Sequence, residues 1–204
     1  MLNTTDRDFE PATTIHRFKL CCEPAPYCPV PRPHCDSECG CFKQLKNVIA
    51  QLIALFSLRT DVNVTVTTVT GTTFTGIPAA IYPSDYDGGL FTLKDAFGTV
   101  TAAISICKIA SIYVPTSEGL STIGYLSDPH CAGHSCQLDC ENALRIYTAS
   151  FLPGTSLQLI TSYHSVSEGT LYANVYGLLV LTDANGFPSF VSTCSVEAVT
   201  VAVP

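Results

Sequence analysis

The sequence predicts a mainly β protein made of two tandem copies of one unit, each a helix followed by five short strands. Three features occur once in each copy and in the same order: a Pro-His-Cys opening, a Leu-x-Asp-x-x-Gly turn and a late cysteine. They lie at 33–35, 93–98 and Cys107 in the first copy, and at 129–131, 181–186 and Cys194 in the second. Self-similarity on this scale indicates a tandem-domain protein.

Residues 1–32 form an N-terminal arm that is rich in proline and cysteine. Proline-dense segments favour the polyproline conformation and act as semi-rigid spacers. Residues 14–20 alternate apolar and polar side chains as a strand does. This strand has no neighbour in the arm, so we expect it to pair with the barrel of another subunit. The donor-strand candidates are Ile15, Phe18 and Leu20.

The first helix-plus-barrel repeat spans 33–114. Seven apolar residues recur at helical spacing and give one apolar face: Phe42, Leu45, Val48, Ile49, Leu52, Ile53 and Phe56. Residues 62–67 then alternate valine with polar residues, as expected of a half-buried strand. Glycine-containing turns separate most of the remaining strand candidates, which lie near 73–82, 89–95, 99–107 and 109–114.

The linker 115–128 is rich in Ser, Thr and Gly and is expected to divide the two units. The second helix-plus-barrel repeat spans 129–204. Its helix runs from about Cys140 to Phe151, and Pro153-Gly154 ends it. The strand candidates that follow lie near 156–162, 166–175, 177–183, 187–194 and 196–203.

A helix followed by five short, strongly bent strands resembles the Sm-like, SH3-like small β-barrel. The match rests on the glycine and turn pattern, with Gly76, Gly89 and the 93–98 turn in the first copy and Gly169, Gly177 and the 181–186 turn in the second. The resemblance implies two tandem five-stranded barrels. It also implies the family's habit of joining barrels into rings or filaments through exposed edge strands.

Sm-like RNA binders carry an Arg-Gly pair in their second motif. The corresponding segments here read Cys107-Lys108-Ile109-Ala110 and Cys194-Ser195-Val196-Glu197, without that pair. The formal net charge is −7, and the ten Lys and Arg residues are scattered singly. No basic stripe is available to neutralise phosphates, so we expect no nucleic-acid partner.

Charged residues make up only 13% of the chain and apolar residues 47%. A globular protein with so little charge is poorly protected against association, which favours assembly with copies of itself. The longest apolar run, 48–56, is too short to span a bilayer, so we expect no membrane insertion. The polar, acidic first fifteen residues contain no signal-peptide pattern.

Eleven cysteines is a high and odd number. Such density indicates disulfides outside a reducing cytosol. We therefore expect synthesis in the cytoplasm without a signal peptide, followed by crosslinking at an extracellular location or a spore surface. The odd number in the arm suggests bonds to another chain, and the intermolecular disulfide candidates are Cys21, Cys22 and Cys28.

Each repeat contains four cysteines, an even number that permits pairing within the repeat. These repeat-cluster disulfide candidates are Cys35, Cys39, Cys41 and Cys107 in the first copy, and Cys131, Cys136, Cys140 and Cys194 in the second. Cys107 and Cys194 could equally be buried small hydrophobic residues on strands.

Zinc is the main alternative to disulfides, because the clusters contain enough ligands for tetrahedral sites. The zinc candidates are Cys35, Cys39, Cys41, Cys131, His134, Cys136 and Cys140. No Cys-x2-Cys pair occurs, which favours disulfides and no cofactor. A third interpretation is a ligand-binding or protein-binding module that uses the barrel face near Tyr82, Tyr86 and Tyr172.

None of the five histidines lies in a recognisable catalytic motif, so we expect no enzyme activity. A cysteine-rich chain with a Cys-Cys pair in a short arm resembles the envelope and appendage proteins of bacterial endospores. The prediction is a structural protein that assembles with itself into disulfide-crosslinked filaments or layers on the spore surface. Other spore-envelope proteins are expected as further partners.

Overall fold

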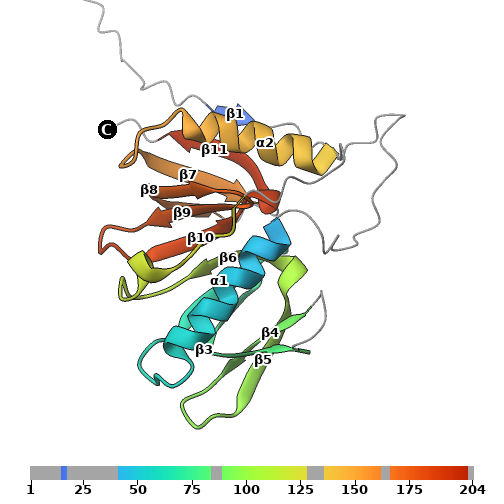
Figure 1. Ribbon diagram of the computed structural model, residues 1–204, viewed down its shortest axis with the longest axis vertical. Helices are drawn as coiled ribbons and strands as arrows, with labels where there is room; N and C mark the ends of the chain where they lie inside the picture. The colour runs from blue at the N-terminus through green and yellow to red at the C-terminus, as the bar shows by residue number, and fades with distance from the viewer. Residues whose placement is uncertain (1–14, 18–40, 84–88, 128–135, 162–165, 202–204) are drawn as a thin grey trace, which may run out of the picture.

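The computed structural model describes residues 15–17, 41–83, 89–127, 136–161 and 166–201 of the chain. They form one antiparallel sheet with two helices packed on it (Figure 1). The mainly β class predicted from the sequence is confirmed. None of the helices in these ranges is both long and apolar enough to cross a bilayer.

The first half of the molecule, residues 41–127, begins with helix α1 (Cys41–Phe56). Its strands are β2 (Val64–Thr68), β3 (Thr73–Tyr82), β4 (Leu90–Lys94), β5 (Val100–Ser105) and β6 (Ile109–Tyr113). A short 3-10 turn, η1 (Ile106–Lys108), connects β5 to β6, and η2 (Leu120–Thr122) follows β6.

The second half, residues 136–201, begins with helix α2 (Cys136–Ala149). Its strands are β7 (Ser156–Thr161), β8 (Val166–Val175), β9 (Leu178–Thr182), β10 (Pro188–Ser192) and β11 (Val196–Val201). The 3-10 turn η4 (Thr193–Ser195) connects β10 to β11. One short strand of the arm is described, β1 (Ile15–Arg17). The predicted strand boundaries agree with these to within about two residues, and the 3-10 turns η1 and η4 replace the ends of the strands predicted at 99–107 and 187–194.

The strand order is β1-β11-β7-β8-β9-β10-β6-β2-β3-β4-β5. Within it, each half places its own five strands in the same relative order, with the last strand first and the fourth strand at the opposite end. The halves meet where β10 pairs with β6. In Figure 1 the sheet runs from β1 and β11 at the top to β4 and β5 at the bottom.

The expectation of two closed five-stranded barrels is not met in the described residues. The sheet is open, and β10 pairs with β6, the last strand of the other half, rather than with β11. Two of the longest strands nevertheless have irregular ladders. The β3–β4 ladder shifts register between Pro78 and Ala80, and the β8–β9 ladder shifts between Leu171 and Ala173. Such irregularities increase the bend and twist of a strand.

The two-residue period of each first strand explains how it lies in the sheet. Val64 and Val66 of β2 are fully buried, as are Leu157 and Leu159 of β7, while the residues between them are partly exposed. The turns after β4 and β9 share one geometry. Asp95 accepts hydrogen bonds from the amides of Phe97 and Thr99, and Asp183 does the same for Asn185 and Phe187.

Two hydrophobic cores lie on the sheet. The larger core contains the apolar face of α1 and also three residues of the second half, Leu178, Val180 and Phe190. The smaller core contains only second-half residues, among them Leu144 of α2 and Leu179 and Leu181 of β9. The larger core is therefore shared between the two halves, with β9 and β10 contributing to it.

The predicted linker packs against α1. Leu120 and Ile123 are buried in the larger core. The Gly124 carbonyl accepts hydrogen bonds from Asn47 at 2.8 Å and from Gln51 at 2.7 Å. The Leu126 amide donates to the Gln44 side chain at 2.9 Å. These contacts hold the connection between the halves along the helix.

Candidate functional site: the junction of the halves and the ends of the sheet

The junction between the halves is a regular antiparallel ladder. Its paired residues are Ser189 with Tyr113, Phe190 with Ile112, and Val191 with Ser111. The Val114 amide donates to the Pro188 carbonyl at 2.9 Å. Backbone groups alternate sides along a strand, so the amides and carbonyls of Phe190 and Ile112 also face each other across the junction.

A disulfide fastens the same junction. Cys41, at the start of α1, is bonded to Cys194 in η4, with the Cα atoms 6.0 Å apart. The Sγ atom of Cys41 also lies 3.2 Å from the Thr193 hydroxyl. The backbone of Gly177 comes so close that an added Cβ would lie 2.8 Å from the Cα of Cys41, and its φ of +72° also favours glycine.

A tyrosine and an aspartate form a polar contact at the edge of the junction. The Tyr113 hydroxyl of β6 donates to Asp183 in the turn before β10, at 3.1 Å. Burial raises the pKa of Tyr113, and the bond to Asp183 adds to this. Burial also acts to raise the pKa of Asp183, but hydrogen bonds from Phe187, Asn185 and Tyr113 lower it overall.

Helix α1 covers the junction on one face of the sheet. Leu178, Val180 and Phe190 of the second half are fully buried in the larger core with Leu45, Val48 and Leu52 of α1. Their neighbours Leu179 and Val191 point to the opposite face and are buried in the smaller core. Strands β9 and β10 are therefore buried on both faces.

Equivalent places in the two halves can be identified from the 3-10 turns. Ser105 precedes η1 and Ser192 precedes η4, while Ile109 and Val196 follow them. The Ile106 amide donates to the Gly89 carbonyl, and the Thr193 amide donates to the Gly177 carbonyl. We call two residues counterparts when they lie the same number of residues from matching points of this kind, one in each half. Strand β5 is then the counterpart of β10, and β11 the counterpart of β6.

In the described residues, the end of the sheet at β5 lacks the second partner strand and the covering helix that β10 has. Strand β5 pairs with β4 and is the last strand in the described sheet. Ala103 is the counterpart of Phe190 and is exposed; Leu90, the counterpart of Leu178, is 37% exposed, and Val100 is 58% exposed. No helix in the described residues covers this face of β4 and β5 as α1 covers β9 and β10.

At the opposite end, the strand β11 is covered by the three residues of β1. The paired residues are Ile15 with Thr200, His16 with Val199, and Arg17 with Ala198. The sequence predicted a strand here that would reach another subunit. In the structure it lies on the last strand of its own chain, and Phe18 and Leu20 lie outside the described residues.

The structure brings together only some of the predicted cysteine sites. Cys41 and Cys194 are bonded across the two halves, rather than each within its own repeat. Cys107 is disulfide-bonded as well, so neither late cysteine is simply a small hydrophobic residue. The side chains of Cys136 and Cys140 are not among those described. The candidates that lie outside the described residues are Cys21, Cys22, Cys28, Cys35, Cys39, Cys131 and His134.

The described residues include no group of three or more His, Cys, Asp and Glu side chains that could hold a metal ion. Cys41, one of the predicted zinc ligands, is oxidised in the disulfide. Two aromatics of the predicted binding face are exposed, with Tyr82 at 67% and Tyr172 at 47%, while Tyr86 lies outside the described residues.

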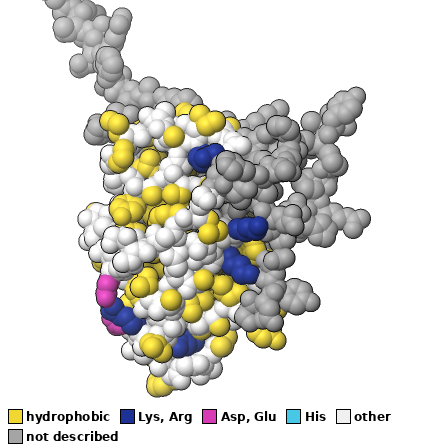
Figure 2. Space-filling view, viewed as in Figure 1, with side chains coloured by type: hydrophobic (Ala, Val, Ile, Leu, Met, Phe, Trp, Pro, Cys, Tyr) yellow, Lys and Arg dark blue, Asp and Glu magenta, His cyan; other side chains and the backbone are white. Residues whose placement is uncertain are grey.

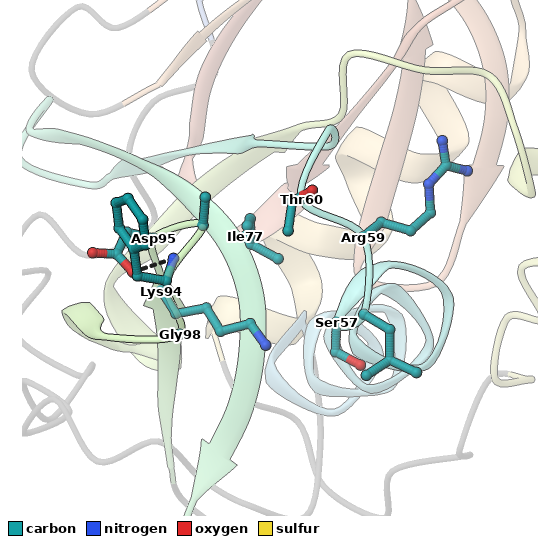
Figure 3. A pocket seen from close by; sticks show the side chains of 10 residues that line it. Ser57, Arg59, Thr60, Ile77, Lys94, Asp95 and Gly98 are labelled. Atoms are coloured by element: carbon teal, nitrogen blue, oxygen red, sulfur yellow. Dashed lines mark hydrogen bonds between the residues drawn. The ribbon is translucent and has the colours of Figure 1, made fainter.

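A shallow hollow of about 260 Å³ lies at the far end of the first half. The segment after α1 and the turn after β4 face each other across Ile77 of β3 (Figure 3). Asp95, the carboxylate in its lining, already accepts two amide hydrogen bonds within its turn. Arg59 is engaged by Asp61 and Glu118. Two charged groups in the lining of the hollow are thus engaged by other groups of the fold.

The surface shows no concentrated charge on the face seen in Figure 2. Lys and Arg side chains form separate spots there, and hydrophobic side chains are spread between them. Comparison of the chain with protein-family models, curated proteins and solved structures found no match. The candidate functional features of the described structure are the junction between the halves and the two unlike ends of the sheet.

Proposed function

We propose that the protein is a structural subunit that assembles with copies of itself by pairing β5 of one copy with β11 of the next. The observation that carries this proposal is the junction inside each chain. There, β10 pairs with β6. Their counterpart β5 lies at one end of the described sheet, and their counterpart β11 has only the three-residue strand β1 beyond it at the other end. One chain thus contains both an example of the contact and the two surfaces needed to repeat it.

The counterpart register gives the proposed contact in detail. Ala102, Ala103 and Ile104 of β5 take the places of Ser189, Phe190 and Val191. They would pair with Thr200, Val199 and Ala198 of the next copy. In the same arrangement, α2 of that copy would lie over the exposed face that includes Leu90 and Ala103, as α1 lies over Leu178 and Phe190.

The two ends of the sheet are different surfaces, so the contact is head-to-tail. Head-to-tail contacts generate rings if the rotation closes and open filaments if it does not. Exposed edge strands are templates for such pairing, and a surface with 13% charged residues offers little electrostatic resistance to it. We propose filaments, or layers of them.

Disulfides would make the assembly durable. The Cys41–Cys194 bond supports an oxidised final location. We propose that Cys21, Cys22 and Cys28 of the arm then link neighbouring copies, that each half derives from one Sm-like unit, and that the material lies on a bacterial spore surface with other envelope proteins. Non-reducing electrophoresis of the assembled material tests the links: covalent oligomers that reductant dissolves are expected, and monomers would contradict them.

The edge contact is tested by Ala103→Pro. Val114 bonds to Pro188, so the backbone of Phe190 faces the junction; by the counterpart relation, the Ala103 amide faces outward from β5. Proline at residue 103 removes the outward-facing amide donor and leaves the pairing with β4 in place. Edge strands tolerate proline at such a position. The matched control is Ala103→Val, which keeps the donor.

Electron microscopy and sedimentation of the oxidised proteins give the readout. We expect the wild type and Ala103→Val to form filaments or layers and Ala103→Pro to remain a folded monomer. Filaments from Ala103→Pro that match those of the wild type would contradict the proposed contact. A wild type that stays monomeric under all oxidising conditions would contradict the function.

A further inference from the structure

We infer that β1 is a built-in cap on the assembly edge, bound by its own chain until β5 of a second copy displaces it. This inference rests on the proposed function, since it concerns how the same edge is regulated. The sequence placed the strand on a neighbouring subunit, where it would promote assembly. The structure places it on β11 of its own chain, where it would oppose assembly.

The evidence is the register of β1. Val196 and Ile109 each follow a 3-10 turn, so Ala198, Val199 and Thr200 are the counterparts of Ser111, Ile112 and Tyr113. Strand β10 pairs with Ser111, Ile112 and Tyr113, and β1 pairs with Ala198, Val199 and Thr200. Both pairings are antiparallel. His16 therefore takes the place on β11 that Phe190 takes on β6. A second copy of β5 cannot bind there while β1 is present.

The cap is built to be weaker than the junction that it imitates. Strand β10 is held by its ladder, by the Cys41–Cys194 bond, by burial of Phe190 and by the contact from Tyr113 to Asp183. Strand β1 has three residues and a ladder of three residue pairs with β11. An incoming β5 would also bring the exposed face near Leu90 under α2, and the apolar area buried there favours the exchange.

The positions of the backbone donors provide a sharp test. The backbone of Ile112 faces β10, so by the counterpart relation that of Val199 faces β1. Its partner His16 then directs its amide toward β11, while the amides of Ile15 and Arg17 point away. His16→Pro removes the donor that holds the cap. Ile15→Pro is the matched control, because it places the same residue one position away, on the side that makes no bond.

Assembly of the full-length proteins is followed by light scattering from a reduced, monomeric start after oxidant is added. We expect His16→Pro to assemble roughly tenfold faster than the wild type, because it loses about one hydrogen bond between β1 and β11. We expect Ile15→Pro to follow the wild type, and His16→Pro combined with Ala103→Pro not to assemble.

The alternative outcomes separate the cap from the function. If His16→Pro assembles at the wild-type rate while Ala103→Pro is blocked, the cap is overturned and edge pairing stands. If His16→Pro is blocked as Ala103→Pro is, β1 is a donor to the neighbouring copy and the cap is again overturned. If no variant and no wild-type sample assembles, both the cap and the proposed function fail.

Discussion

Strands β10 and β5 occupy equivalent places in the two halves and have opposite surroundings. β10 has a partner strand on each side and a core on each face, whereas among the described residues β5 pairs only with β4 and has no helix over one face. The side chains match these surroundings. Leu178, Val180 and Phe190 are fully buried, and their counterparts are Leu90, Thr92 and Ala103, which are smaller or more polar overall.

Under the proposed function, the same position in the two halves serves folding at β10 and association between copies at β5. A large apolar side chain at Ala103 would favour indiscriminate aggregation of the free chain. A small side chain at this position leaves the backbone amides and carbonyls of β5 to provide specificity. The following variants test whether the two positions differ as much as this account requires.

The largest effect is expected for Phe190→Ala. Its ring is fully buried between the sheet and α1, and removing it leaves a cavity that costs about 3–5 kcal/mol of unfolding free energy. Urea unfolding of the reduced monomer provides the measurement. Ala103→Ser at the counterpart position should change the stability by less than about 0.5 kcal/mol. Similar losses at both positions would show that β5 is already covered in the monomer.

The next largest effect concerns the Cys41–Cys194 disulfide, which is separated by 153 residues of sequence. Crosslinks that close long loops restrict the unfolded chain most, and losing one typically costs about 2–5 kcal/mol. We expect Cys41→Ser and Cys194→Ser to lower the unfolding free energy equally under oxidising conditions, and the double variant to match either one. Wild-type stability in either single variant would mean that the bond does not fasten the halves.

A smaller loss is expected for Tyr113→Phe, which removes the hydroxyl that bonds to Asp183. A hydrogen bond of this kind contributes about 0.5–1.5 kcal/mol. The counterpart residues are Thr200 and Asp95, so the proposed contact between copies has no equivalent tyrosine. Unfolding of the monomer should therefore respond to Tyr113→Phe while the assembly rate does not. A large change in assembly rate with unchanged stability would contradict this division.

The smallest effect is a pH dependence at Asp183. Its pKa is lowered in the folded protein, so the carboxylate stabilises the fold above the ordinary aspartate pKa of about 4. That contribution is lost as the pH falls below this value and through the lowered pKa. Unfolding measured between about pH 5 and pH 2 should show a smaller acid loss in Asp183→Asn than in the wild type. Equal acid losses would show that Asp183 makes no such contribution.

Much of the local structure could be predicted from the sequence, because local patterns determine it. The spacing of Leu45, Val48, Ile49 and Leu52 predicted α1, and these residues are buried in the core. Valine alternation predicted β2, and the Leu-x-Asp-x-x-Gly pattern predicted two turns that each have an aspartate bonded to two amides. Hydrophobic period and turn chemistry act over a few residues, so one sequence reveals them.

The pairing between the halves could not be predicted in this way. A strand pattern such as that of β10 shows which residues are buried but not which strand lies beside it. One signal was present: Leu178, Leu179, Val180 and Leu181 form a continuous apolar run, typical of a strand buried on both faces. The counterpart run in β4 is interrupted by Thr92. The disulfide from Cys41 to Cys194 followed from this pairing and was equally hidden, because cysteine spacing does not determine connectivity.

In the proposed contact, β5 becomes an interior strand when copies of the chain join. Hydrogen exchange of the Ala103 amide, compared between the reduced monomer and the assembled material, tests it most directly. The account predicts fast exchange in the monomer and strong protection in the assembly, like that of the Phe190 amide in both states. An assembly in which the Ala103 amide still exchanges as fast as in the monomer would contradict it.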